Sequence, residues 1–207
     1  GKYPDNQKRM WSGYYASVSF MDEQVGKIID ELDALGLRDS TAIVFTSDHG
    51  YHLGDHQFWQ KSNLHEQVLR VPLVMSVPNL PSGTSEAVVE LVDIYPTVCA
   101  LTGQKIPAEV QGMSLVPLLT KNTNQVKPGA LSFNNGFSLR TSNWHYMRYK
   151  DGTRELYDMK ADPGEFTNLA TQTEFSARVQ EMDAILQTRL GRVGIQTKQQ
   201  AAKPRKT

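Results

Sequence analysis

Histidine and acidic side chains gather in one polar stretch of this 207-residue sequence. Four of the five histidines and three acids fall between residues 48 and 66, namely Asp48, His49, His52, Asp55, His56, His65 and Glu66. Imidazole nitrogens and carboxylate oxygens are common metal ligands in proteins. The stretch is therefore a candidate metal site.

Asp48 and His49 are the strongest candidate ligands, because they directly follow the apolar run 41–46. That run is short and rich in β-branched residues, which predicts a buried strand. Ligands of open α/β sheets bind at the carboxyl ends of strands. A turn-capping Asp beside a solvated His is the alternative. His52, His56 and His65 lack this placement and are interpreted as loop residues or neighbours of the site.

Lys61 adds a positive charge to the same stretch. An ammonium beside a metal site can hold a tetrahedral anion such as phosphate or sulfate, although a solvated surface lysine is the simpler alternative. Gly50 and Gly54 allow close backbone approach and unusual turns. The pattern predicts a binding loop that folds back on itself.

The elements around this loop are predicted from hydrophobic periodicity. Apolar residues recur at steps of three and four over residues 14–35, which indicates an amphipathic helix that Gly36 ends. Residues 64–69 are a short helix that would include His65, and residues 71–77 are a second strand. A helix followed by a buried strand is half of a βαβ unit, so strand 41–46 is expected inside a mainly parallel sheet.

The pattern changes after residue 128. Four short extended runs, at 130–133, 137–141, 144–149 and 154–157, are separated by turn signals that include Asn134-Asn135-Gly136. They predict a small antiparallel sheet with helix 172–190 packed on it. The predicted fold class is therefore α/β with an added antiparallel sheet and carboxyl-terminal helix. The expected divisions are 1–103, then a linker and β subdomain at 104–191, then a basic disordered tail at 192–207.

Composition excludes several classes of protein. With 39% hydrophobic residues the chain can build a core, and 22 basic against 22 acidic residues argue against nucleic-acid binding through bulk charge. The longest apolar runs have only four residues, so no membrane-spanning helix is expected. The single cysteine, Cys99, is predicted to be a buried structural thiol.

Several motifs together resemble the type I sulfatases of the alkaline-phosphatase-like superfamily. The run from Thr46 to His56, followed by Trp59-Gln60-Lys61, resembles their second metal-and-anion motif. The resemblance extends over residues 10–190 and includes Arg70-Val71-Pro72-Leu73, Leu91 to Thr97, Leu139-Arg140-Thr141, Glu155 to Asp158, Asp162-Pro163, Glu165 and Asn168-Leu169. It is closest to the iduronate-2-sulfatase-like branch, because Lys61 follows the Gly54-Asp55-His56 step by five residues.

The resemblance implies a sulfuric ester hydrolase. In that family a formylglycine, made from the cysteine of a Cys-x-Pro-x-Arg motif, attacks the sulfur while calcium and basic residues hold the sulfate oxygens. Asp48 and His49 would be metal ligands and Lys61 would bind sulfate. The ligand types alone suggest zinc or manganese, since calcium prefers oxygen; the family implies calcium.

The sequence departs from that pattern in one large respect. It contains no Cys-x-Pro-x-Arg or Ser-x-Pro-x-Arg motif, and Cys99 is followed by Ala100-Leu101-Thr102. The chain therefore resembles the carboxyl-terminal half of a sulfatase, expected to be inactive without the amino-terminal half as its partner. The family implies a periplasmic, secreted or lysosomal-type location and a sulfated sugar or small sulfate ester as substrate.

Two alternatives to a sulfatase remain open at this point. A metal-dependent phosphoesterase of the same superfamily would share the Thr-Ser-Asp-His-Gly run and would differ in its nucleophile. A non-catalytic module would bind a sulfated glycan or a partner without turnover. The residues of this chain do not specify which sulfate ester is bound.

Overall fold

The computed structural model describes residues 5–195. It contains two compact units, which are treated separately below: the first joins residues up to 62 with 67–80, and the second joins 63–66 with the chain from 81 onward. This division falls near residue 80, whereas we placed a boundary at residue 103 from the sequence; the domain division of the enzyme stays a prediction.

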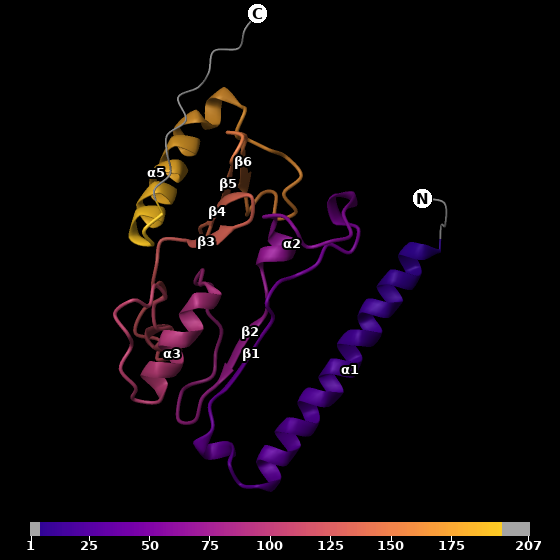
Figure 1. The fold of residues 1–207 in the computed structure, drawn as a ribbon, viewed down its shortest axis with the longest axis vertical. Helices are drawn as coiled ribbons and strands as arrows, with labels where there is room; N and C mark the ends of the chain where they lie inside the picture. The colour runs from indigo at the N-terminus through magenta and orange to yellow at the C-terminus, as the bar shows by residue number, and fades with distance from the viewer. Residues whose placement is uncertain (1–4, 196–207) are drawn as a thin grey trace, which may run out of the picture. The chain divides into compact units, whose positions relative to one another are not determined.

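The first unit begins with the long helix α1, Asn6–Ala34 (Figure 1). It starts eight residues earlier than the predicted helix 14–35. It ends as predicted, because Gly36 has a φ of +66° and Leu37 N–H donates to the carbonyl of Leu32 at 3.0 Å. A single turn of 3₁₀-helix, Arg38–Ser40, leads into the following strand.

Strand β1, Ile43–Thr46, pairs with β2, Leu73–Ser76, in a two-stranded antiparallel sheet. The register places Thr46 opposite Leu73 and Ile43 opposite Ser76. The expectation of a mainly parallel sheet is wrong for the described residues, in which β1 has only this antiparallel neighbour. A non-alternating apolar run indicates burial on both faces, but it carries no information about strand direction.

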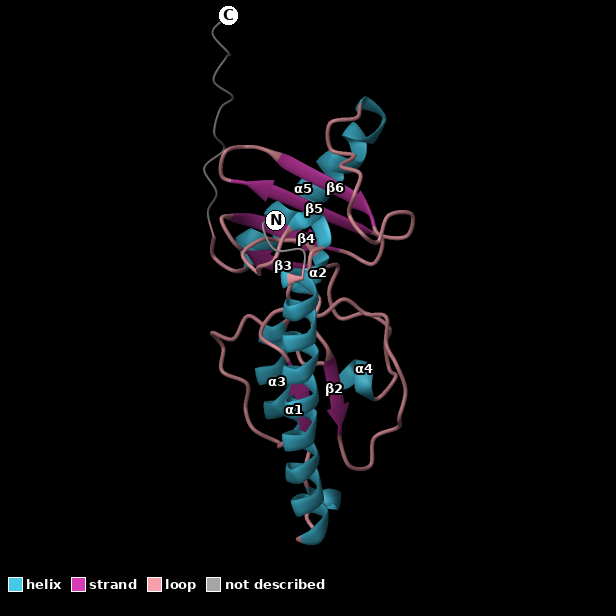
Figure 2. Cartoon of the chain, turned by 90° about the vertical axis from the view of Figure 1, so that its right-hand side faces the viewer, coloured by secondary structure: helices cyan, strands magenta, loops and turns pink. Residues whose placement is uncertain are grey.

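The second unit contains two short helices, α3 at Ile94–Leu101 and α4 at Val116–Leu119, before its sheet. The strands are β3 (Ala130–Phe133), β4 (Gly136–Arg140), β5 (Trp144–Tyr149) and β6 (Arg154–Asp158). They lie in sequence order and all pair antiparallel, which confirms the predicted sheet (Figure 2). Further 3₁₀ turns lie at Leu91–Asp93 and Thr173–Phe175.

Helix α5, Ser176–Arg192, packs across one face of this sheet (Figures 1 and 2). Leu139, Tyr146 and Leu156 stand opposite one another on neighbouring strands. They form the core with four apolar side chains of the helix, namely Val179, Met182, Leu186 and Leu190. The predicted packing is confirmed.

The helix continues to Arg192, which we had assigned to the basic tail, and residues 196–207 of that tail lie outside the described residues. Cys99 is buried in α3, as predicted. Among residues 5–195, no helix is both long and apolar enough to cross a membrane.

Candidate metal and anion site

The loop after β1 folds back on itself through main-chain hydrogen bonds. His52 N–H donates to the Gln60 carbonyl at 3.1 Å, and Gly54 N–H donates to that of Phe58 at 3.0 Å. Gly54 has a φ of +105°, a conformation that side chains disfavour. The sequence predicted such a loop from its glycines.

Gly50 anchors this loop to the short helix α2, Glu66–Leu69. Its N–H donates to the Val68 carbonyl at 2.7 Å. A Cβ at position 50 would lie only 2.0 Å from the carbonyl oxygen of Gln67, so the contact requires glycine. This contact therefore fixes the backbone next to His49.

The side chains of Asp48, His49 and Lys61 meet at the start of the loop. Lys61 Nζ lies 2.7 Å from His49 Nε2, and Asp48 Oδ2 lies 3.5 Å from the same nitrogen. Asp48 also accepts the His49 amide hydrogen at 3.0 Å. Three residues selected from the sequence, thirteen positions apart at their furthest, therefore form one cluster.

The hydrogen-bond partners of His49 indicate which ring nitrogen donates and which accepts. Nδ1 lies 2.8 Å from the Gly50 carbonyl oxygen, which can only accept, so Nδ1 carries the hydrogen. Lys61 can only donate, so Nε2 must present its lone pair. In this arrangement Nδ1 donates to the Gly50 carbonyl, and Nε2, the nitrogen nearer Asp48, accepts from Lys61.

This arrangement fits part of a divalent metal site. An imidazole nitrogen and a carboxylate oxygen lie 3.5 Å apart, and the side chain of Asp48 is 85% exposed to solvent. Two donors do not complete a coordination sphere, which for calcium takes six to eight oxygens. Asp48 and His49 would therefore supply a minority of the ligands.

The other histidines of the stretch lie apart from this cluster. His52 is fully buried, and its ring contacts the rings of Phe58 and His56 edge-on at 5.4 and 5.7 Å. Their interpretation as supporting residues fits these contacts. His65 precedes α2, which begins at Glu66, so our expectation that it lies within that helix is wrong.

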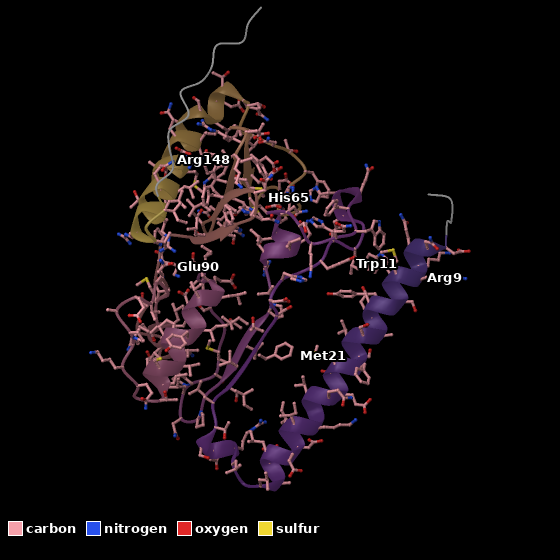
Figure 3. The ribbon with its side chains drawn as sticks, in the orientation of Figure 1. Arg9, Trp11, Met21, His65, Glu90 and Arg148 are labelled. Carbon is pink, nitrogen blue, oxygen red and sulfur yellow. The ribbon has the colours of Figure 1, made fainter. Side chains whose placement is uncertain are left out.

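In the second unit, His65 belongs to a buried polar cluster around Glu165 (His65 is labelled in Figure 3). One carboxylate oxygen of Glu165 accepts from His65 Nδ1 at 2.8 Å and from the Glu66 amide at 2.9 Å. The other accepts from Nδ1 of His145, on β5. Glu165 therefore joins residues 65 and 66 to the sheet face that is opposite α5.

Electrostatics in this cluster favour the ionised carboxylate. Burial alone would raise the pKa of Glu165, but hydrogen bonds from His145 and His65 outweigh burial and bring the pKa to about 2. Burial alone would lower the pKa of His65, whereas its hydrogen bond to Glu165 and the charges of Glu165 and Glu155 raise that pKa above 6.5. Each group thus stabilises the charged form of the other.

His145 Nε2 lies 2.6 Å from the hydroxyl of Ser138, which completes a hydroxyl–imidazole–carboxylate chain. That order of groups is also found in nucleophile triads. Ser138 and His145 are both fully buried, however, so a substrate does not reach the hydroxyl. These hydrogen bonds therefore hold the sheet and the Glu165 loop together.

Glu66 adds a second ionic contact to this face. Its carboxylate binds Arg140, with Oε2 2.9 Å from Nε and Oε1 3.3 Å from Nη2. Glu66, His145 and Glu165 could share a metal by distance alone, since their donor atoms lie within 4.8 Å of one another. The pairing with Arg140 and the hydrogen bonds of His145 satisfy these groups without an ion.

A buried ionic network lies elsewhere in the second unit (Glu90 is labelled in Figure 3). Lys127 binds both Glu90 and Asp93, and Arg189 of α5 binds Glu90 at 2.7 Å. Asp93 also accepts the amide hydrogens of Glu90 and Met113, each at 2.8 Å. Two acids and two bases balance in charge, so the network joins the turn that precedes α3 to α5.

Sequence reasoning missed both buried clusters. Their members lie far apart in the chain, as His65 and Glu165 do at 100 positions. Glu165 was noted only as part of the sulfatase resemblance. Its positive φ of +60°, which is uncommon outside glycine, marks it as a specially held residue but is visible only in the structure.

Comparison with known families shows which family the chain belongs to. Residues 1–104 match the family model described as Sulfatase, and residues 54–192 match N-sulphoglucosamine sulphohydrolase, C-terminal. A sulfatase of Formosa agariphila is 35% identical over 86% of this chain and 36% of its own length. Arylsulfatase K of Xenopus laevis is 36% identical over 84% of the chain and 36% of its own length.

Solved structures agree with this assignment. One, in complex with its substrate D-glucosamine-2-N,6-O-disulfate, has a TM-score of 0.78 and 27% identity over 87% of this chain and 40% of its own. A phosphonate monoester hydrolase of Agrobacterium radiobacter has a TM-score of 0.79 and 26% identity over 87% and 41% of the two chains.

The chain belongs to the sulfatase family, and its architecture is that of the alkaline-phosphatase-like sulfatases. It spans about a third of the length of the curated relatives that it matches. The resemblance drawn from its motifs is confirmed at the level of the family.

Proposed function

We propose that this chain forms part of a sulfuric ester hydrolase that removes sulfate from a sulfated sugar. Asp48 and His49 are metal ligands in this proposal, and Lys61 binds the sulfate group. The observation that carries it is the cluster in which Lys61 Nζ and Asp48 Oδ2 lie 2.7 and 3.5 Å from Nε2 of His49.

The residues of the chain prepare this site in a defined way. The Gly50 carbonyl holds the hydrogen of His49 on Nδ1 and leaves the Nε2 lone pair for a metal. Nε2 has one lone pair, so a metal held there by His49 would leave the Lys61 ammonium available to an anion. A bound divalent cation supplies Lewis-acid stabilisation of negative charge on the sulfate oxygens.

Calcium and a formylglycine nucleophile are the finer parts of the proposal. Both rest on the sulfatase resemblance, and the Cys-x-Pro-x-Arg motif that would supply the nucleophile is not in this sequence. The amino-terminal half of the enzyme would then provide the nucleophile and the remaining ligands. Within the family we propose an iduronate-2-sulfatase-like specificity, on the basis of the Gly54-Asp55-His56 step and Lys61.

The choice of a sulfated sugar rests on the relatives. One structural neighbour has D-glucosamine-2-N,6-O-disulfate as its substrate, and another is a 2-O glycosaminoglycan sulfatase with a TM-score of 0.79 and 27% identity. A phosphonate or phosphate ester is the second candidate substrate, because the phosphonate monoester hydrolase is as similar in fold.

The test is turnover by the full-length enzyme that contains this chain. Sulfate release from sulfated mono- and disaccharides would be measured beside release from phosphate and phosphonate monoesters, with calcium, manganese, zinc or a chelator present. The proposal expects sulfate release that the chelator abolishes and calcium restores. Preferential cleavage of phosphonate or phosphate esters would instead establish the second candidate.

A further inference from the structure

The short helix α2 carries contacts at both of its ends. At its start, the Glu66 amide donates to the Glu165 carboxylate at 2.9 Å, and the Glu66 side chain pairs with Arg140. The backbone of Gly50 packs against the carbonyls of the next two residues, Gln67 and Val68. Gly50 in turn holds His49 through its own carbonyl oxygen.

We propose that Glu165 is a positioning residue for the metal and anion site, acting through α2 on the loop that carries His49 and Lys61. The inference rests on the proposed function of that loop. The connection consists of named bonds: Glu165 to the Glu66 amide, the α2 main chain, and Val68 to Gly50.

The burial of Glu165 makes it suited to this task. Its side chain is fully buried, and its three hydrogen-bond donors come from two separate places in the chain: the neighbours His65 and Glu66, and His145 on β5. Hydrogen bonds to an ionised acceptor are stronger than neutral ones, so the carboxylate holds the start of α2 in one place. A four-residue helix has little stability of its own and depends on such contacts.

His145 restrains Glu165 from the sheet. Both of its ring nitrogens are engaged, one by Glu165 and the other by Ser138 at 2.6 Å. The imidazole is held between β4 and the Glu165 loop, so the carboxylate has a rigid support. The order of support is therefore sheet, His145, Glu165, α2 and then the loop.

The precision of the loop matters because its ligands are few. Residues that orient the ligands of a metal typically change affinity or activity by about ten- to a hundredfold when they are altered. Glu165→Gln keeps the size of the side chain but removes the charge and one acceptor. It should loosen α2 and the Gly50 contact while Asp48, His49 and Lys61 remain present.

The matched control is Asp183→Asn. Asp183 is also a carboxylate that accepts two side-chain hydrogen bonds, from Tyr146 and Arg148, each at 2.9 Å. It lies on α5, which packs on the opposite face of the sheet from Glu165. Both variants should lower the melting temperature, but only Glu165→Gln should affect the site.

The experiment compares full-length wild type, Glu165→Gln and Asp183→Asn below their melting temperatures. Terbium luminescence measures metal affinity, hydrogen exchange measures protection of the Gly50 amide, and steady-state kinetics give KM and kcat. We expect Glu165→Gln to weaken terbium binding by about tenfold or more, to speed exchange at Gly50 and to raise KM. Asp183→Asn should change none of these.

Each outcome separates the positioning role from the proposed function. If Glu165→Gln lowers only the melting temperature, as the control does, the positioning role is overturned. If the wild type has no sulfatase activity but Gly50 exchange and terbium affinity still respond to Glu165→Gln alone, the proposed function fails and the positioning role stands.

Discussion

Lys61 and Asp48 exert opposite influences on His49. The carboxylate can only accept a hydrogen bond from Nε2, whereas the ammonium, which can only donate, requires Nε2 to accept. The ammonium lies closer, at 2.7 Å against 3.5 Å, and the Gly50 carbonyl fixes the remaining hydrogen on the other nitrogen. The Nε2 lone pair that Lys61 contacts is therefore the one that a metal would use.

Substitution of the two proposed ligands should differ in effect from substitution of Lys61. In the full-length enzyme, Asp48→Ala and His49→Ala should lower metal occupancy and abolish turnover, because each removes a donor atom. Lys61→Ala should leave the metal bound. Its lost charge-assisted contact is worth about 1.5–3 kcal/mol, so KM should rise roughly ten- to a hundredfold.

Metal content and sulfate-ester kinetics of the three variants, measured side by side, check this prediction. His56→Ala is a suitable companion, because it lies in the same loop and is not a proposed ligand. Normal turnover by Lys61→Ala would remove its assignment to the anion. Full metal content in His49→Ala would mean that Asp48 and His49 form a turn and not a ligand pair.

Glu165 should make stability depend on pH in the acid range. Its pKa is lowered from 4.5 to about 2 in the folded state, so the unfolded chain takes up the proton first as pH falls. The stabilisation is complete above pH 4.5 and is lost between there and pH 2. The difference in pKa corresponds to about 3 kcal/mol of unfolding free energy.

Urea midpoints of the full-length protein between pH 6 and pH 2 would measure this effect. Glu165→Gln should remove this part of the decline, so that its stability approaches that of wild type as the pH falls. Glu181→Gln, at an exposed pair with Arg178, should decline as wild type does. A constant difference between wild type and Glu165→Gln across the range would contradict the prediction.

Elements with a local signal could be predicted from the sequence. The 3.6-residue period of α1 and α5 and the turn residues between β3 and β6 are visible within short windows. Gly36 likewise marks the end of α1. The pairing of β1 could not be predicted, because strand direction depends on the path of the 26 residues between Thr46 and Leu73.

The candidate site likewise combines residues that could be predicted from the sequence with residues that could not. Asp48, His49 and Lys61 lie in one loop and could be selected by type and spacing. The support at Glu165 could not, since it depends on a residue 99 positions from Glu66 and on a strand register that places His145 opposite Arg140 and Tyr157. Long-range contacts of this kind leave no periodic signal in the sequence.

At the scale of elements, the contact between the loop and α2 predicts an effect of Gly50→Ala. The new Cβ would lie 2.0 Å from the Gln67 carbonyl oxygen, a distance that real Cβ atoms do not adopt, so the loop or α2 must shift. We expect metal affinity and turnover to fall at least tenfold, as for other residues that orient ligands. Terbium titration and kinetics of the full-length variant would measure both.

Gly26→Ala is the matched control for this substitution. Gly26 lies within α1, where no described atom outside the local helix backbone is within 4 Å of the position that its Cβ would occupy. Alanine in a helix interior is favoured over glycine by roughly 0.5–1 kcal/mol, so this variant should be as stable as wild type or more so. Equal metal affinity in the two variants would exclude a role for the Gly50 contact.

At the scale of the whole chain, burial is unevenly distributed. The second unit has a continuous core between its sheet and α5. The 29-residue helix α1 has no buried residue, and its Phe20 and Ile28 are 66% and 70% exposed (Trp11 and Met21 are labelled on it in Figure 3). Exposed apolar surface of this extent is typical of a face that another part of a protein covers.

The isolated chain of 207 residues is therefore expected to aggregate or to be only marginally stable. Apolar side chains on α1 would associate between copies, and the two strands β1 and β2 are too few to fold independently without cover. Co-expression with the remainder of a full-length sulfatase should raise the soluble fraction, and so should Phe20→Glu or Ile28→Glu in the chain alone. Leu186→Glu should lower it, because Leu186 is fully buried in the core of the second unit. Light scattering and thermal unfolding would measure these effects, and a sharp, reversible transition of a monomeric lone chain would show that α1 needs no such cover.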